Sequence, residues 1–306
     1  MPIAVFGSIN IDLTTYADRL PRPGETLHGE RYALGLGGKG CNQAVAARRL
    51  GSVTTLIGRI GEDEFGARAR AELAAMGVPT QDIFQDPDSD TGIAVIGVDS
   101  SAQNCITVIG GANMAIDGSD VGRAAERLGA ADILLLQMEI PLQPALMAAD
   151  LVRQSGGRVI LDPAPAPANG YAPGVLARID VITPNETETE LLTGLKPTNP
   201  KEAAEAAGKL REQGVAAAVV KLGASGVYFQ DAESEGFVEP FKVDSIDSVA
   251  AGDCFNGGLA TALSEGRPLA EAVRFAAACG ALSTTKRGAS ASAPTREAVE
   301  DLLARA

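Results

Sequence analysis

The chain has 306 residues, 45% of them hydrophobic, and a formal net charge of −13. This length can enclose a large buried core, and an acidic balance without any basic block argues against nucleic acid as a partner. One histidine and four scattered cysteines exclude a His-based catalytic triad, a multi-histidine metal site and a disulfide framework.

The N-terminal segment predicts a buried strand followed by polar residues. Ile3–Phe6 is a short apolar run that ends at Gly7, and Asn10 and Asp12 follow it. Ligands of open α/β sheets bind at the carboxyl ends of the strands, so both side chains are candidates for polar ligand contacts. Ordinary turn chemistry is the alternative, since Asn and Asp both favour turns.

A glycine-rich stretch, residues 35–42, leads into an Ala-rich helix expected over Gln43–Leu50. Its spacing formally fits the dinucleotide-binding pattern GxGxxG. However, the next expected strand, Thr54–Ile57, is followed by Arg59 instead of an acidic residue, which disfavours an NAD enzyme. Lys39 also lacks the spacing of a phosphate-binding P-loop. What remains is a tight backbone loop with a cation and an amide, suited to a hydroxyl-rich or anionic ligand.

Two further segments predict a hairpin. Thr91–Val98 and Cys105–Ile109 read as strands. Together with an extended stretch over Thr26–Leu36, they form a small β-rich subset within a chain that otherwise alternates strands and helices. A lid over a cleft and a dimer interface are both compatible with this subset.

From Asp120 onward, strands and helices alternate regularly, which predicts a parallel sheet covered on both faces. The expected strands are 133–137, 158–161, 180–183, 217–222 and 227–230. The expected helices are 120–128, 143–154, one ending at Leu192, 201–213, 255–263, 269–285 and 296–304. Polar clusters follow the strands at 139, 185–188 and 223–226. We find no internal repeat or flexible linker, so a single domain over 1–306 is expected.

The stretch Asp247–Gly258 places two carboxylates around small residues, just where an apolar helix pattern begins. The N-terminus of a helix offers unpaired N–H groups and a positive dipole, and therefore suits an anion. A carboxylate there repels phosphate, unless Asp253 takes a proton from the group that attacks the phosphate. The alternative is an ordinary first-turn carboxylate favoured by the helix dipole.

Four motifs occur in order along nearly the whole chain: Gly7–Asp12, Gly37–Ala44, Thr183–Glu188 and Asp247–Asn256. Together they resemble the ribokinase-like (PfkB) family of carbohydrate kinases. The resemblance implies an α/β fold with a central, mostly parallel sheet, helices on both faces and a small β-sheet lid formed by segments of about 13–36 and 91–110. It implies ATP-dependent phosphorylation of D-ribose at the 5-hydroxyl. The alternative is a kinase of another small sugar or nucleoside, such as 2-deoxyribose, another pentose or adenosine.

The resemblance also implies the residues of the reaction site. The sugar would be held by Asn10, Asp12, Gly38, Lys39, Asn42 and Glu139. This set fits the chemistry, because sugar hydroxyls pair well with carboxylate and amide oxygens. Asp253 would be the catalytic base, and the N–H groups of Ala250, Ala251 and Gly252 would form the anion hole. Phosphoryl transfer needs such positioning and charge stabilisation more than covalent help.

The same resemblance implies binding sites for Mg²⁺, ATP and K⁺. Asn185 and Glu188 would help place Mg²⁺ and the phosphates, partly through water. ATP would be lined by Lys221, Gly223, Ser225, Gly226 and Gly252. A K⁺ site would use the side chains of Asp247 and Ser292 and the carbonyls of Val249, Ser283, Lys286 and Gly288. Two positions depart from the common pattern: Lys221 stands where threonine is often found, and Ala277 where some members carry a larger polar residue.

A sugar sensor without activity on the same scaffold is a further alternative, although the intact Asp253, Asn185 and Glu188 speak against it. The N-terminus is too short and uncharged for a signal peptide, and no apolar run approaches the roughly 18 residues of a membrane span. We therefore expect a cytoplasmic protein without a membrane partner, and a homodimer formed through the β-lid.

Overall fold

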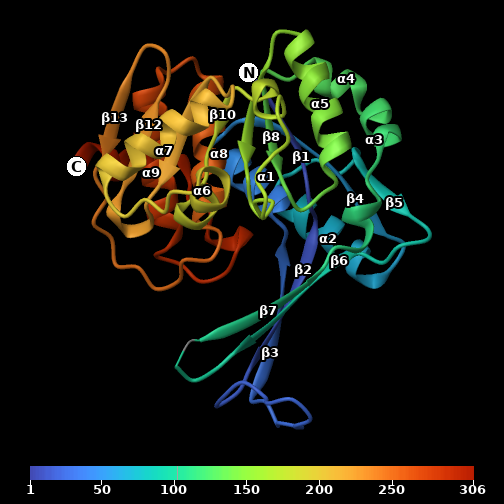
Figure 1. Cartoon of the computed structure of the whole chain (residues 1–306). Coiled ribbons are helices and arrows are strands. Elements are labelled where there is room, and N and C mark those ends of the chain that lie inside the picture. The colour runs from blue at the N-terminus through green and yellow to red at the C-terminus, as the bar shows by residue number, and fades with distance from the viewer. Residues whose placement is uncertain (102) are drawn as a thin grey trace.

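The computed structural model describes residues 1–101 and 103–306. A nine-stranded sheet forms its centre, in the order β13-β12-β11-β10-β9-β8-β1-β4-β5 (Figure 1). The strands are β1 (Pro2–Phe6), β4 (Val53–Gly61), β5 (Ile83–Asp86), β8 (Ile133–Gln137), β9 (Arg158–Asp162), β10 (Val181–Ile182), β11 (Ala217–Lys221), β12 (Val227–Gln230) and β13 (Glu235–Val238). All neighbouring pairs are parallel except those of β12 with β11 and β13.

Helices cover both faces of this sheet and enclose two hydrophobic cores. One face carries α1 (Lys39–Arg49), α2 (Glu64–Ala75), α8 (Ala251–Ser264), α9 (Leu269–Ser283) and α10 (Arg296–Arg305). The other carries α3 (Gly118–Arg123), α4 (Ala125–Gly129), α5 (Leu142–Gln154), α6 (Glu186–Thr193) and α7 (Pro200–Glu212). Successive side chains of β1 point to opposite faces of the sheet. Ile3 and Val5 therefore pack in the first core, and Ala4 and Phe6 pack in the second.

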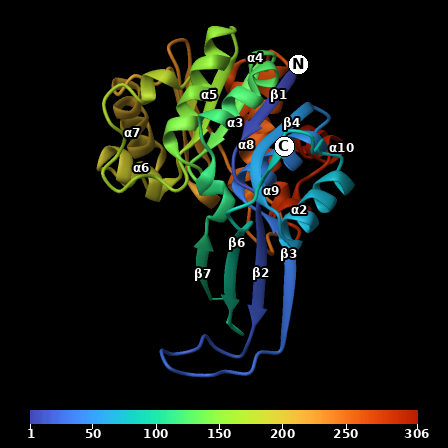
Figure 2. The ribbon, with the colours of Figure 1, turned by 90° about the vertical axis from the view of Figure 1, so that its right-hand side faces the viewer.

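A second sheet projects from the α/β body, as two views at right angles show (Figures 1 and 2). It contains β2 (Asn10–Tyr16), β3 (Arg31–Gly37), β6 (Gly92–Val98) and β7 (Asn104–Ile109), in the order β3-β2-β6-β7. The expected fold class, a large mostly parallel sheet with helices and a small separate sheet, is therefore confirmed. Ala102, within the expected lid segment 91–110, lies outside the described residues.

Several local expectations differ from the structure. Asn10 and Asp12 lie in strand β2, where pairing with β3 and β6 gives the backbone the hydrogen bonds that a turn would otherwise supply. The helix expected over 120–128 is divided into α3 and α4 at Ala124, and α1 begins at Lys39, before the expected Gln43. The short strand β5 was not expected. No helix in the described ranges is both long and apolar enough to cross a membrane.

The strand order places a crevice beside β1. After β1 the chain continues to β4 on one side of it, whereas β8 lies on its other side. Such a switch in strand order opens a crevice at the carboxyl ends, where ligands of open α/β sheets bind. Ser8 follows β1 and Glu139 follows β8, so both lie at this crevice.

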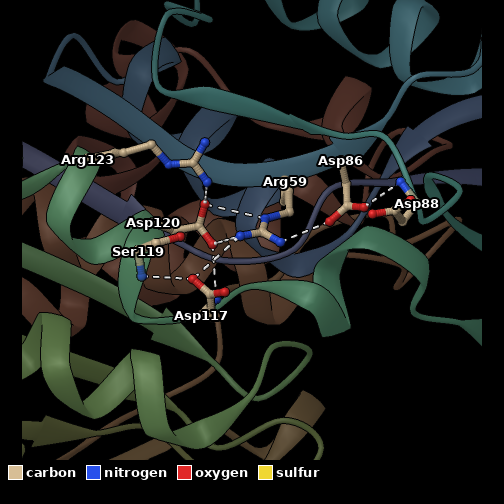
Figure 3. A network of polar contacts seen from close by, with 7 residues as sticks. All are labelled: Arg59, Asp86, Asp88, Asp117, Ser119, Asp120 and Arg123. Atoms are coloured by element: carbon tan, nitrogen blue, oxygen red, sulfur yellow. Dashed lines mark hydrogen bonds and ion pairs between the residues drawn. The ribbon is translucent and has the colours of Figure 1, made fainter.

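A charged cluster fastens the sheet to the segment by which the chain returns from the small sheet (Figure 3). Arg59 on β4 is almost buried and pairs with Asp86 of β5 at 2.9 Å and with Asp120 of α3 at 2.5 Å. Asp117 caps α3 and lies 3.6 Å from the same guanidinium group. The cluster thus joins β4, β5 and the start of α3.

Replacing Arg59 by methionine should therefore destabilise the fold, because the buried carboxylate of Asp86 loses its counterion and that of Asp120 keeps only the half-exposed Arg123. We expect Arg59→Met to lower the free energy of unfolding by about 3 kcal/mol, measured by denaturant titration. Lys209→Met, which removes the exposed partner of Glu205 on α7, serves as the control and should leave the denaturation midpoint unchanged. An equal, small effect of both changes would contradict a structural role for the cluster.

Candidate active site

Glu139 follows β8, and its carboxylate contacts both the segment after β1 and the start of α1. Ser8 donates a hydrogen bond from Oγ to Oε2 of Glu139 at 2.5 Å, and the backbone N–H of Lys39 donates to the same oxygen at 3.1 Å. The N–H of Gly40 donates to Oγ of Ser8 at 3.3 Å. The strand end and the N-terminus of α1 therefore fix the Glu139 carboxylate together.

Two glycines allow this close approach. Gly38 has a φ of 87°, and a Cβ atom there would lie 2.8 Å from the backbone nitrogen of Asn10. A Cβ at Gly40 would lie 2.6 Å from the backbone of Gly7. The glycine-rich stretch thus packs its backbone directly against the junction of β1 and β2, which brings Asn10 beside the start of α1.

Asp253 lies in the first turn of α8 and is only 6% exposed. Asn42 donates from Nδ2 to one carboxylate oxygen at 2.9 Å, and Gln43 donates from Nε2 to the other at 3.1 Å. Burial raises the pKa of Asp253 to about 6, although Lys39 opposes this shift. The structure thus presents a carboxylate with an elevated proton affinity at a helix N-terminus.

Other charged groups lie near Asp253. Burial, with contributions from the carboxylates of Glu139 and Asp253, raises the pKa of Asp12 to about 6. Burial alone lowers the pKa of Lys39, but Asp253 and Asp162 raise it above its usual value, so its ammonium group stays charged. The strand register places Asp12 beside Ala94 of β6. Several carboxylates and one cation therefore lie close together, with Ala94 next to Asp12 on the neighbouring strand.

The backbone before α8 adopts an unusual conformation. Ala250 has a φ of 59°, and no other non-glycine residue of the described ranges has a positive φ. Within those ranges, nothing accepts a hydrogen bond from the backbone N–H groups of Ala250, Gly252 and Asp253. Ala251 differs from our expectation, because its N–H donates to the carbonyl of Ser248 at 3.3 Å. Three free donors thus gather at the terminus of α8.

Asn185 and Glu188 form a capping box at the start of α6. Each Glu188 oxygen accepts one hydrogen bond from Asn185, at 2.8 and 2.9 Å. Burial raises the pKa of Glu188, with Lys221 opposing and the carboxylate of Asp162 adding to the shift. The partly buried Glu188 carboxylate and the buried Asp162 carboxylate have free lone pairs that fit a hydrated Mg²⁺, which commonly keeps several water ligands.

The turn after β11 contains the residues expected to line the nucleotide. Gly223 and Ser225 belong to the one-turn 3₁₀ helix η3 (Gly223–Ser225), and the carbonyl of Gly226 accepts the N–H of Leu222 at 2.9 Å. Lys221, the last residue of β11, reaches the first turn of α8. Its Nζ lies 3.5 Å from the position that a Cβ on Gly252 would occupy.

Asp247 joins two distant segments into one loop cluster. Its carboxylate accepts the N–H groups of Val249 and Gly288, both at 3.0 Å. Ser283 and Lys286 belong to the same turn, since the carbonyl of the first accepts the N–H of the second at 3.2 Å. Ser292 instead donates from Oγ to the carbonyl of Ala289 at 2.8 Å.

This loop cluster has the donors that a monovalent cation needs. In the part of the chain that the structure describes, nothing donates to the carbonyl oxygens of Val249, Lys286 and Gly288. One carboxylate with free carbonyls suits a weakly charged, hard cation such as K⁺. The described residues contain no group of three or more His, Cys, Asp or Glu side chains arranged around a metal ion.

Comparison with known proteins agrees with this geometry. The sequence profile of the pfkB family carbohydrate kinases matches residues 2–296. The chain belongs to this family. Ribokinase of Haemophilus influenzae is 39% identical over 98% of each chain, and deoxyribokinase of Salmonella typhi is 34% identical over 99% of each. The structure of Arabidopsis thaliana ribokinase complexed with ribose and ATP matches with a TM-score of 0.92 and 34% identity, over 99% of this chain and 98% of that one.

The sequence alone did not identify several residues that contact the candidate site of this carbohydrate kinase. Gln43 and Asp162 are buried and bonded to each other at 3.0 Å, yet only the position of Asp162 at a strand end signals its presence in the site. Ser290 donates to Oδ1 of Asn42 at 2.6 Å and so fixes which side of that amide faces Asp253. These partners come from segments far apart in the sequence, which no local pattern reveals.

Asn113 is the clearest example of such a residue. It lies in the 3₁₀ helix η1 (Gly111–Ala115), directly after the last strand of the small sheet, and is 1% exposed. Its side chain accepts the N–H of Ile9 at 2.9 Å and donates from Nδ2 to Oδ1 of Asn10 at 2.7 Å. This bond directs Oδ1 of Asn10 toward Asn113, so Nδ2 of Asn10 points away from Asn113 and can donate to another group.

Asn113→Asp should weaken sugar binding, because a carboxylate oxygen would then face Oδ1 of Asn10 and favour the opposite amide orientation. We expect the KM for the sugar to rise about tenfold, the cost of roughly one buried hydrogen bond, with the KM for ATP unchanged. The control is Asn199→Asp at the exposed N-cap of α7, where either residue caps equally well. Equal KM values for the sugar in wild type and Asn113→Asp would refute this role.

Proposed function

We propose that this protein transfers the γ-phosphoryl group of ATP to the 5-hydroxyl of D-ribose. The observation that carries the proposal is the buried Asp253 carboxylate beside three unpaired N–H groups at the start of α8. A base next to an anion hole is what transfer to a hydroxyl requires. The ribose-bound and ATP-bound relative supports the choice of substrates. Because ATP is the donor, we place the reaction in the cytoplasm.

Each side chain of the pocket has a role in this reaction. Asn10, Asp12, Asn42, Lys39 and Glu139 bind the sugar hydroxyls and hold the 5-hydroxyl against Asp253. As the hydroxyl oxygen forms its bond to the γ-phosphorus, its proton passes to the Asp253 carboxylate. The bond from the γ-phosphorus to the bridging oxygen breaks, and ADP leaves with the electron pair. The free N–H groups of α8 bind the equatorial oxygens throughout.

Two ions fit residues of this chain. Glu188 and Asn185 would hold Mg²⁺ through water, and a bound Mg²⁺ neutralises part of the phosphate charge. Asp247, Ser292 and the free carbonyls of the loop cluster would hold K⁺ next to the start of α8. Asp247 and Asp253 then have different functions, the first toward the cation and the second toward the sugar.

The small sheet supports a homodimer. Val95 and Ile109 lie on the face of this sheet opposite Asp12 and are 36% and 52% exposed. Every residue of the edge strand β7 is exposed, and exposed apolar faces and edges of this kind are usually covered by a partner. We infer that a second copy covers this face. Sedimentation equilibrium tests the inference, and a monomer at micromolar concentration would refute it.

The substrate assignment is tested by measuring ADP release with ribose, 2-deoxyribose and adenosine in the presence of Mg²⁺. We expect the highest kcat/KM with ribose, because the carboxylate and amide acceptors of the pocket match a full set of hydroxyls. We also expect higher activity in K⁺ than in Na⁺ at equal ionic strength. A higher kcat/KM with 2-deoxyribose would instead identify the protein as a deoxyribokinase, like the Salmonella relative. No turnover of any of these substrates would favour a sugar sensor.

The pH dependence of kcat/KM should follow the protonation of the pocket. Asp253 must be ionised to accept a proton, and burial raises its pKa to about 6 despite the opposing charge of Lys39. Activity should therefore be constant near neutral pH and fall as the pH drops through about 6. Because burial also raises the pKa of Asp12 to about 6, the slope of log(kcat/KM) against pH should exceed one on the acidic side. Stopped assays between pH 5 and 8 measure this, and a flat profile would contradict the assigned base.

A further inference from the structure

Lys221 stands at the meeting point of the nucleotide turn and the start of α8. We propose that its ammonium group contacts the transferred phosphoryl group and stabilises the negative charge that this group carries in the transition state. The inference rests on the proposed function and assigns Lys221 a part in the chemistry, beyond lining the nucleotide.

The position of the ammonium group is the first argument. Lys221 ends β11, and its side chain is only 13% exposed. Its Nζ lies 3.5 Å from where a Cβ on Gly252 would be, so it lies over the first turn of α8. The N–H of Gly252 is one of the three unpaired donors at this terminus. An anion bound by these donors would therefore meet the Lys221 ammonium group as well.

The second argument is the way in which Lys221 is held. Its Nζ donates to Oδ1 of Asp162 at 3.3 Å, and the Asp162 side chain is 3% exposed. The other Asp162 oxygen accepts Nε2 of Gln43 at 3.0 Å, and the same Nε2 donates to Asp253 at 3.1 Å. Gln137 in turn donates to Oε1 of Gln43 at 2.6 Å. A continuous chain of bonds thus fixes the ammonium group relative to the catalytic base.

The energetic balance is the third argument. Removing a lysine and an aspartate from water costs more than their attraction returns in many proteins, so a buried pair alone adds little stability. At this place the pair stands beside free N–H donors and further carboxylates, Asp253 and Glu188. A lysine whose only task was to neutralise Asp162 would not need to reach Gly252. Binding an additional anion explains both the pairing with Asp162 and the position of the ammonium group over the first turn of α8.

The test uses Lys221→Gln, which keeps a donor for Asp162 but removes the charge, and Lys221→Met as a second variant. Lys201→Gln, an exposed lysine on α7, is the control. Steady-state assays give kcat and both KM values. Calorimetry with ribose and Mg²⁺ present gives the affinity for ADP and for ADP with aluminium fluoride, which mimics the phosphoryl group in transfer.

We expect Lys221→Gln to lower kcat by about 10²-fold, as the loss of one oxyanion donor does elsewhere. The affinity for ADP with aluminium fluoride should fall by a similar factor, while the affinities for ribose and for ADP alone change less than about threefold. A kcat near that of wild type, or an equal loss of affinity for both nucleotide complexes, would overturn the proposal. If the wild-type protein does not turn over ribose, the proposed function is refuted. The affinities of wild type and Lys221→Gln for ADP and for ADP with aluminium fluoride would still test the role of Lys221.

Discussion

The whole site depends on one constraint, a carboxylate buried at the N-terminus of a helix. Asp253 occupies a place that favours anions, yet the anion of the reaction must bind beside it. The structure resolves this conflict by holding the carboxylate with the amides of Asn42 and Gln43, on the side of α1. The N–H groups at the start of α8 thereby stay free, and in the proposed reaction they bind the phosphoryl group. Burial raises the pKa of Asp253 and makes it a better proton acceptor than an exposed aspartate.

The strand order and the packing of α1 against α8 bring these groups together. The switch in strand order beside β1 brings the ends of β1 and β8 to the N-terminus of α1, and α1 packs directly against α8. A Cβ at Gly257 would lie 2.6 Å from Ala46, so small residues set the spacing between these two helices. The amides of α1 reach Asp253 only because the helices lie this close.

Much of the fold, and many of the residues that gather at the candidate site, could be predicted from the sequence. The alternation of strands and helices predicted the sheet, the motifs pointed to Asp253 and the glycine-rich stretch, and the family resemblance added Glu139. The pairing of Asn10–Tyr16 with β3 and β6 was not predictable, since turn and strand preferences compete locally there. Asn113, Gln43 and Asp162 escaped notice because their importance lies in partners that only the folded chain brings together.

The central claim is that Asp253 accepts the proton of the attacking hydroxyl, and Asp253→Asn tests it most directly. The amide keeps the shape of the side chain but cannot take the proton, and Asp244→Asn on an exposed loop is the matched control. Calorimetry and steady-state assays should show ribose affinity within about threefold of wild type and kcat reduced by about 10³-fold or more. Near-normal turnover by Asp253→Asn would contradict the account.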